Sequence, residues 1–101
     1  MTRYEMVRLF NEYGEKASFD CFKNLTDKPS SRADLCAFIM LDQLLPNSKS
    51  LDLVCCAEHD QIWLDVDLNE LAKVVTERDV EYLDACGVWV DEDTDSLSMF
   101  V

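Results

Sequence analysis

The first half of the chain has a helical pattern of apolar residues. Near the start these residues recur at every third position, as Tyr4, Val7, Phe10 and Tyr13. Thr2 is followed three residues later by Glu5, which matches a capping box, an arrangement in which two side chains bond the free N–H groups at a helix start. We therefore expect a helix from about residue 3 to residue 15, ending near Gly14.

Two more helices are expected before residue 50. Apolar residues at every third position favour a short helix over residues 18–25. After a turn at residues 27–30, Ser31 with Asp34 predicts the start of a further helix, which Pro46 and Asn47 end. This helix has apolar residues on almost every side, which is typical of a helix at the centre of a core.

The pattern changes to alternation after residue 50. Residues 51–57 and 61–68 flank a polar segment at 58–60, and this order predicts a β-hairpin. In the second run we expect the apolar side to face the core, and it consists of Ile62, Leu64, Val66 and Leu68. The side chains between them, which include Trp63, Asp65 and Asp67, are expected to face the other way.

Local signals divide the rest of the chain into two helices and a second hairpin. Asp67 with Glu70 marks one helix start, and Thr76 with Asp79 marks the next. The latter helix is expected to end at Gly87, since glycine favours the left-handed conformation that follows many helices. Residues 88–91 and 96–101 then flank a short acidic turn and predict a hairpin.

This order of elements predicts one α+β domain over residues 1–101. We expect an antiparallel sheet of about four strands, formed by the two hairpins, packed against three to four helices. The length suits a single core, and the sequence has no linker and no internal repeat. The neutral, helical half covers about residues 1–50, and the acidic half covers about residues 51–101.

Charge is distributed very unevenly between these halves. The chain has 9 Lys or Arg and 21 Asp or Glu, a formal net charge of −12. Residues 1–50 hold seven of each sign, whereas residues 51–101 hold fourteen Asp or Glu against Lys73 and Arg78 alone. Such a balance excludes a protein that binds nucleic acid directly, because phosphates need basic side chains. It favours a basic protein as partner.

The sequence also bears on location. No segment reaches the roughly 18 apolar residues of a membrane span, and the start lacks the apolar stretch of a signal peptide. We therefore expect a cytoplasmic protein without membrane contact. Its 5 Cys are an odd number and scattered, so we expect reduced and mostly buried thiols rather than disulfides. The oligomeric state, monomer or dimer, stays open.

Metal and catalytic motifs are weak. Asp91-x-Asp93-x-Asp95 resembles the beginning of a calcium loop, but Ser96 replaces the required glycine and no acidic residue closes the loop. The cluster of Cys55, Cys56 and His59 lacks the usual spacing of zinc ligands. No phosphate-binding, dinucleotide-binding or nucleophile motif occurs. We expect a non-enzymatic protein without metal or cofactor.

The candidate site is therefore a surface that binds a partner. Glu77, Glu81 and Asp84 fall at helical spacing and should line one face of their helix. Trp63, which shares a predicted strand face with two aspartates, is the first apolar anchor, and Trp89 and Phe100 are the next. The full candidate set is Trp63, Asp65, Asp67, Glu77, Glu81, Asp84, Asp91, Glu92, Asp93 and Asp95.

In size, acidity and lack of a catalytic motif the chain resembles small acidic phage-encoded inhibitors of the anti-CRISPR and anti-restriction kind. The resemblance is one of composition and lies mainly in residues 51–101. It implies a protein that binds and inhibits a basic nucleic-acid-binding protein or nuclease complex in the host cytoplasm, by occupying its DNA- or RNA-binding surface. Two alternatives stay open: an immunity protein that neutralises a nuclease toxin, and a small adaptor or scaffold protein.

Overall fold

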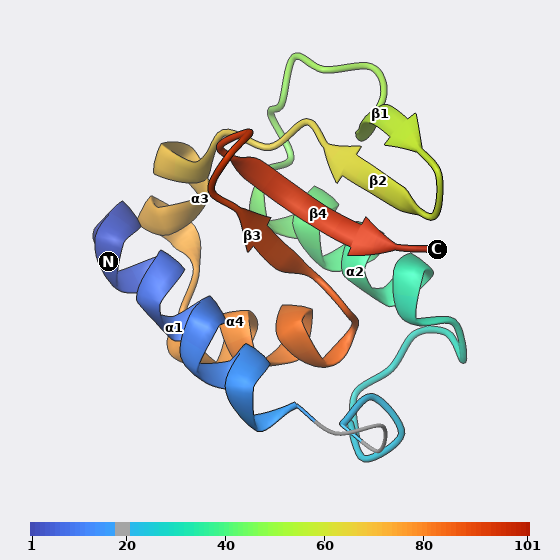
Figure 1. The fold of residues 1–101 in the computed structure, drawn as a ribbon. Coiled ribbons are helices and arrows are strands. Elements are labelled where there is room, and N and C mark those ends of the chain that lie inside the picture. Colours follow the sequence, from blue (N-terminus) through green and yellow to red (C-terminus); the bar gives the residue numbers. More distant parts are fainter. Residues whose placement is uncertain (18–20) are drawn as a thin grey trace.

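The chain folds into helices packed against one antiparallel sheet (Figure 1). The computed structural model describes residues 1–17 and 21–101. Within these residues the elements are, in order, α1 (Arg3–Lys16), α2 (Ala33–Leu44), β1 (Val54–Glu58), β2 (Gln61–Leu64), α3 (Leu68–Val74), α4 (Glu77–Ala85), β3 (Trp89–Asp91) and β4 (Ser96–Phe100). The expected α+β fold, with a four-stranded antiparallel sheet and four helices in the described residues, is thus confirmed.

Three helices begin where their capping residues predict. Thr2 and Thr76 each accept a backbone hydrogen bond within a complete capping box, at the starts of α1 and α4. Asp67 caps α3 by accepting from the backbone N–H groups of Asn69 and Glu70. After α4, Gly87 adopts a φ of +95°, the left-handed conformation expected there.

The strand order of the sheet is β1-β2-β4-β3, with antiparallel neighbours throughout. The last strand in the sequence, β4, therefore lies between β2 and β3 and joins the second hairpin to the first. In this register Leu64 and Val90 both pair with Leu97, so one face of the sheet is aliphatic. Trp63 and Trp89 both pair with Ser98, which places these three residues in one row on the opposite face.

The aliphatic face and the helices enclose one core (Figure 1). Each helix contributes buried residues: Met6, Leu9 and Phe10 from α1, Cys36, Ala37 and Leu41 from α2, Leu68, Leu71 and Ala72 from α3, and Val80 and Leu83 from α4. On the sheet side the core residues are Ile62, Leu64, Val90, Leu97 and Met99. Val66 and Leu68 are buried as predicted, although both follow the end of β2.

Several local expectations were wrong. Residues 21–24 form a turn instead of a helix, and the rest of the expected segment, 18–20, lies outside the described residues. Ser31 does not cap α2, because the helix begins one residue later with Arg32 as its N-cap. The strands of the first hairpin are also shorter than expected, since β1 begins at Val54 and β2 ends at Leu64.

Helix α2 and the cysteines are less buried than expected. Helix α2 packs by one side only and is not at the centre of the core, so Leu35 and Ile39 are exposed. None of the five cysteines, all of which the structure describes, forms a disulfide, but Cys55 and Cys56 are exposed on β1. Only Cys36 and Cys86 are buried, and Cys21 is half-buried.

Candidate partner-binding surface

The predicted row of carboxylates on α4 lies beside helix α1. Val80 and Leu83 point into the core, and Glu77, Glu81 and Asp84 lie on the adjacent side of α4, which faces α1. The hydroxyl of Tyr13 on α1 donates a hydrogen bond to Oε1 of Glu77, at 3.1 Å. The row is therefore not an isolated acidic stripe, because part of it is engaged within the protein.

We call the contact between α1 and the row Glu77, Glu81 and Asp84 of α4 the α1–α4 seam. Burial and neighbouring charge change two pKa values along this seam. Asp84 is half-buried, and loss of hydration raises the pKa of its carboxyl group to about 6. Loss of hydration, together with the hydrogen bonds that its hydroxyl donates to Glu77 and Glu81, raises the pKa of Tyr13 to about 12. Gly14 of α1 lies beside Asp84, since a Cβ at this position would be in ordinary contact with Oδ1 of Asp84, at 3.7 Å.

A shallow hollow of about 330 Å³ opens beside the seam. It is lined by Tyr13, Lys16, Cys21, Asn24, Leu25, Glu81, Asp84 and Ala85. Lys16 places a positive charge next to two of the predicted carboxylates. The seam is thus a mixed polar surface, which is less suited to attract a basic partner than a purely acidic one.

Burial alternates as expected through Asp65 and Asp67, since Leu64, Val66 and Leu68 are buried and both aspartates are exposed. Strand β2 itself ends at Leu64, so the two aspartates lie between β2 and α3 rather than in the strand. Asp65 accepts a hydrogen bond from the hydroxyl of Ser50, and Asp67 caps α3. Both carboxylates are exposed, but each is engaged in its own loop.

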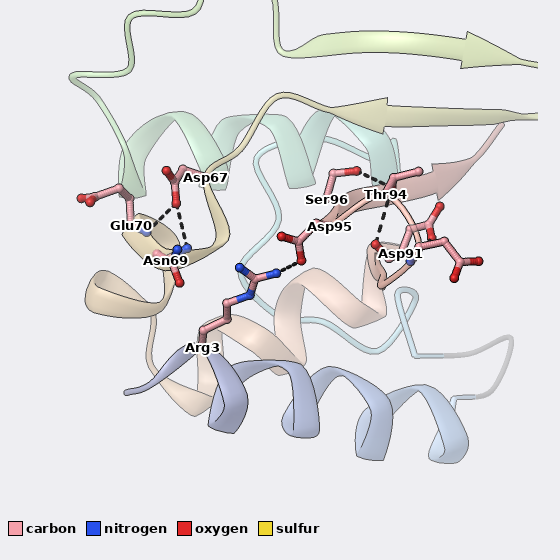
Figure 2. Close-up of polar contacts among 9 residues, drawn as sticks. Arg3, Asp67, Asn69, Glu70, Asp91, Thr94, Asp95 and Ser96 are labelled. Carbon is pink, nitrogen blue, oxygen red and sulfur yellow. Dashed lines mark hydrogen bonds and ion pairs between the residues drawn. The ribbon is translucent and has the colours of Figure 1, made fainter.

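The remaining predicted carboxylates lie in and beside the turn between β3 and β4. Asp91 accepts hydrogen bonds at Oδ1 from the backbone of Asp93 and at Oδ2 from Trp63. These bonds, that from Trp63 first, lower the pKa of Asp91. Asp95 adopts a φ of +61° and forms an ion pair with Arg3, which extends from α1 toward the turn in Figure 2.

The outer face of the sheet carries the aromatic residues. The indole Nε1 of Trp63 donates to Oδ2 of Asp91 at 2.8 Å, so the ring spans β4 above Ser98. Ser98 is fully buried, and its hydroxyl donates to the carbonyl of Ile62 and accepts from the amide of Gln61. A small polar residue at this position leaves room for the indole.

Trp89 completes this face together with Phe100. Their rings stack with centroids 5.5 Å apart and an interplanar angle of 30°. Phe100 is nevertheless 69% exposed, whereas Nε1 of Trp89 is buried without a hydrogen-bond partner among the described residues. The alternation of residues predicted the outward direction of these rings, but not the contact between Trp63 and Asp91, which depends on the strand order.

Most carboxylates of the second half face solvent. Of the fourteen in residues 51–101, all are exposed except Asp79, Asp84 and Asp91, which are half-buried. Among the described residues, Lys73 pairs with Glu70 and Arg3 with Asp95. The majority of this negative charge is therefore available to a partner.

In the described residues no group of three or more His, Cys, Asp or Glu is arranged to hold a metal ion. Nor does any helix there combine the length and apolar character needed to cross a membrane. Comparisons with protein-family models, with curated proteins and with solved structures gave no match.

Proposed function

We propose that this is a non-enzymatic binding protein that recognises a basic, nucleic-acid-processing protein and inhibits it. The observation that carries the proposal is the exposure of eleven of the fourteen carboxylates in residues 51–101, with few cations to balance them. Such a surface attracts a positively charged partner and raises its association rate. A surface built to bind nucleic acid has the complementary charge, so this protein competes with the partner's own nucleic acid.

The proposal is tested with the intact protein as immobilised bait for a lysate, followed by purification of the retained partner. The partner's binding to its own nucleic acid is then measured with increasing amounts of the protein. We expect inhibition that weakens as salt rises, because screening shortens the range of charge attraction. A partner that stays bound at high salt, with no effect on its nucleic-acid binding, would favour the adaptor alternative and overturn the proposal.

Two charge-matched variants make the test specific. One carries Glu81→Gln, Glu92→Gln and Asp93→Asn, three exposed carboxylates of the second half. The control carries Glu15→Gln, Asp34→Asn and Asp42→Asn, three exposed carboxylates of the first half. Both variants have the same net charge. We expect the first to lose tenfold or more in affinity and the control to lose much less. Equal losses would mean that only total charge matters.

A further inference from the structure

The outer face of the sheet differs in chemistry from the rest of the acidic half. Trp63, Trp89 and Phe100 lie on it, and no helix covers it in Figure 1. Of these three residues Phe100 is the most exposed, at 69%, so its ring is accessible to a partner from this face. This face therefore offers an apolar platform, which the row on α4 does not.

The two hairpins that form this face contain no lysine and no arginine. Residues 54–64 and 89–100 instead hold six carboxylates, which are Glu58, Asp60, Asp91, Glu92, Asp93 and Asp95. Glu92 and Asp93 are exposed, and among the described residues neither forms an ion pair. Asp91 lies at the edge of the platform, since it holds Trp63 by a hydrogen bond.

Aromatic rings beside carboxylates suit an arginine side chain. A guanidinium group is planar, stacks on an aromatic ring and bonds a carboxylate with two parallel N–H groups at the same time. A lysine ammonium group is a compact charge that cannot do both in this way. Phe100 lies beside Asp60 at one end of β4, whereas Trp63 and Asp91 lie toward the acidic β3–β4 turn at the other end. We infer that the outer sheet face, with Trp63, Trp89 and Phe100 and the acidic β3–β4 turn, docks a segment of the basic partner that carries several arginines, different ones contacting the two ends. This inference rests on the proposed function and names the surface that performs it.

The experiment uses isotope-labelled intact protein with three probes: octa-arginine, octa-lysine and an eight-nucleotide single-stranded DNA. The chain has 2 Trp, so two indole N–H signals report on the platform. We expect octa-arginine to shift both indole signals and to bind about three- to fivefold more tightly than octa-lysine.

Three variants identify the origin of this preference. Phe100→Leu keeps an apolar side chain but removes the exposed ring, and it should abolish the preference for arginine. Tyr4→Leu removes an exposed ring, 77% exposed on α1, and should leave the preference intact. The triple change Glu77→Gln, Glu81→Gln and Asp84→Asn should weaken the binding of both peptides by the same factor. The ratio of their two affinities should therefore stay unchanged.

The outcomes show whether the inference fails alone or together with the proposed function. Equal binding of the two peptides, with shifts confined to α4, would overturn the inference and leave the proposed function standing. Failure of both peptides to bind at low salt would overturn both. Indole shifts with the DNA and with neither peptide would also overturn both, because the sheet would then be a platform for nucleic-acid bases.

Discussion

The indole nitrogen of Trp63 lies 2.8 Å from Oδ2 of Asp91, although strand β4 separates the strands that carry them. This bond fixes the ring of Trp63 across the sheet and holds one carboxylate at its edge. It links the aromatic platform to the acidic turn in a single arrangement.

The first prediction concerns the pKa of Asp91. Because the bond from Trp63 favours the ionised form, the folded pKa is lower than the ordinary value of 3.8. The stabilising contribution is thus present above pH 3.8 and is lost as the pH falls through the lower folded value. Trp63→Phe should raise the pKa of Asp91 toward its ordinary value, which an NMR titration of the side-chain carboxyl carbon measures. Trp89→Phe is the control, since the indole nitrogen of Trp89 bonds no described acceptor. Equal effects of the two variants would refute this account.

Replacing each of the two glycines by alanine should change the free energy of unfolding, in opposite directions. At Gly87 an added Cβ meets nothing closer than 4.0 Å, but the φ of +95° disfavours any side chain. We expect Gly87→Ala to lower the free energy of unfolding by about 1–2 kcal/mol. Gly14 is inside α1, where a Cβ would make only ordinary contacts and alanine favours the helix. Gly14→Ala should therefore raise the free energy of unfolding by up to about 1 kcal/mol. Urea denaturation of both variants checks the pair, and a change of the same sign in both would contradict the explanation.

Asp84 should make stability depend on pH in a specific direction. Its folded pKa of about 6 lies above the ordinary 3.8, so its ionisation destabilises the fold. The penalty is fully present above pH 6 and disappears below pH 3.8. Because the carboxylate is only half-buried, solvent reduces the effect, and we expect Asp84→Asn to stabilise the protein by about 1 kcal/mol at pH 8.

The measurement for Asp84 is the difference in unfolding free energy between variant and wild type from pH 3.5 to pH 8. Asp42→Asn, on the exposed side of α2, is the matched control and should show a flat difference. A constant difference for Asp84→Asn across this range would mean that burial does not perturb the group.

His59 occupies a backbone conformation that suits glycine. It lies in the two-residue turn between β1 and β2 with a φ of +56°. We expect His59→Gly to stabilise the protein by about 0.5–1 kcal/mol and His59→Ala to give no such gain. Thermal unfolding of the three proteins provides the comparison. A gain with alanine equal to that with glycine would show that the imidazole, not the backbone, is unfavourable.

The sequence predicted best those features that depend on a few neighbouring residues. The caps at Thr2, Asp67 and Thr76 needed only residues three positions apart. The alternation of buried residues also continues to Leu68 as expected, but the strand ends at Leu64 and Asp67 caps α3. Ser31 failed as a cap because α2 started one residue later, after a bend in which the hydroxyl of Ser30 accepts from the backbone of Arg32.

The candidate site was predicted less completely, because its geometry depends on contacts between distant segments. Tyr13 and Glu77 are 64 positions apart, and nothing in either helix indicates that α1 engages the row on α4. Helical spacing predicted correctly that the three carboxylates share one face of α4, but it could not predict that α1 packs beside this face. Alternation likewise gave the outward direction of Trp89, whereas the row formed with Ser98 and Trp63 follows only from the strand order.

The position of β4 in the sheet has a consequence for synthesis. This strand pairs with β2 on one side and β3 on the other, yet it leaves the ribosome after both. Until then β2 has an open edge where β4 will pair, and the first hairpin lacks the connection to β3. The sheet therefore closes after translation of Ser96–Phe100, and the nascent chain depends on its helices and its charge to avoid pairing with another chain.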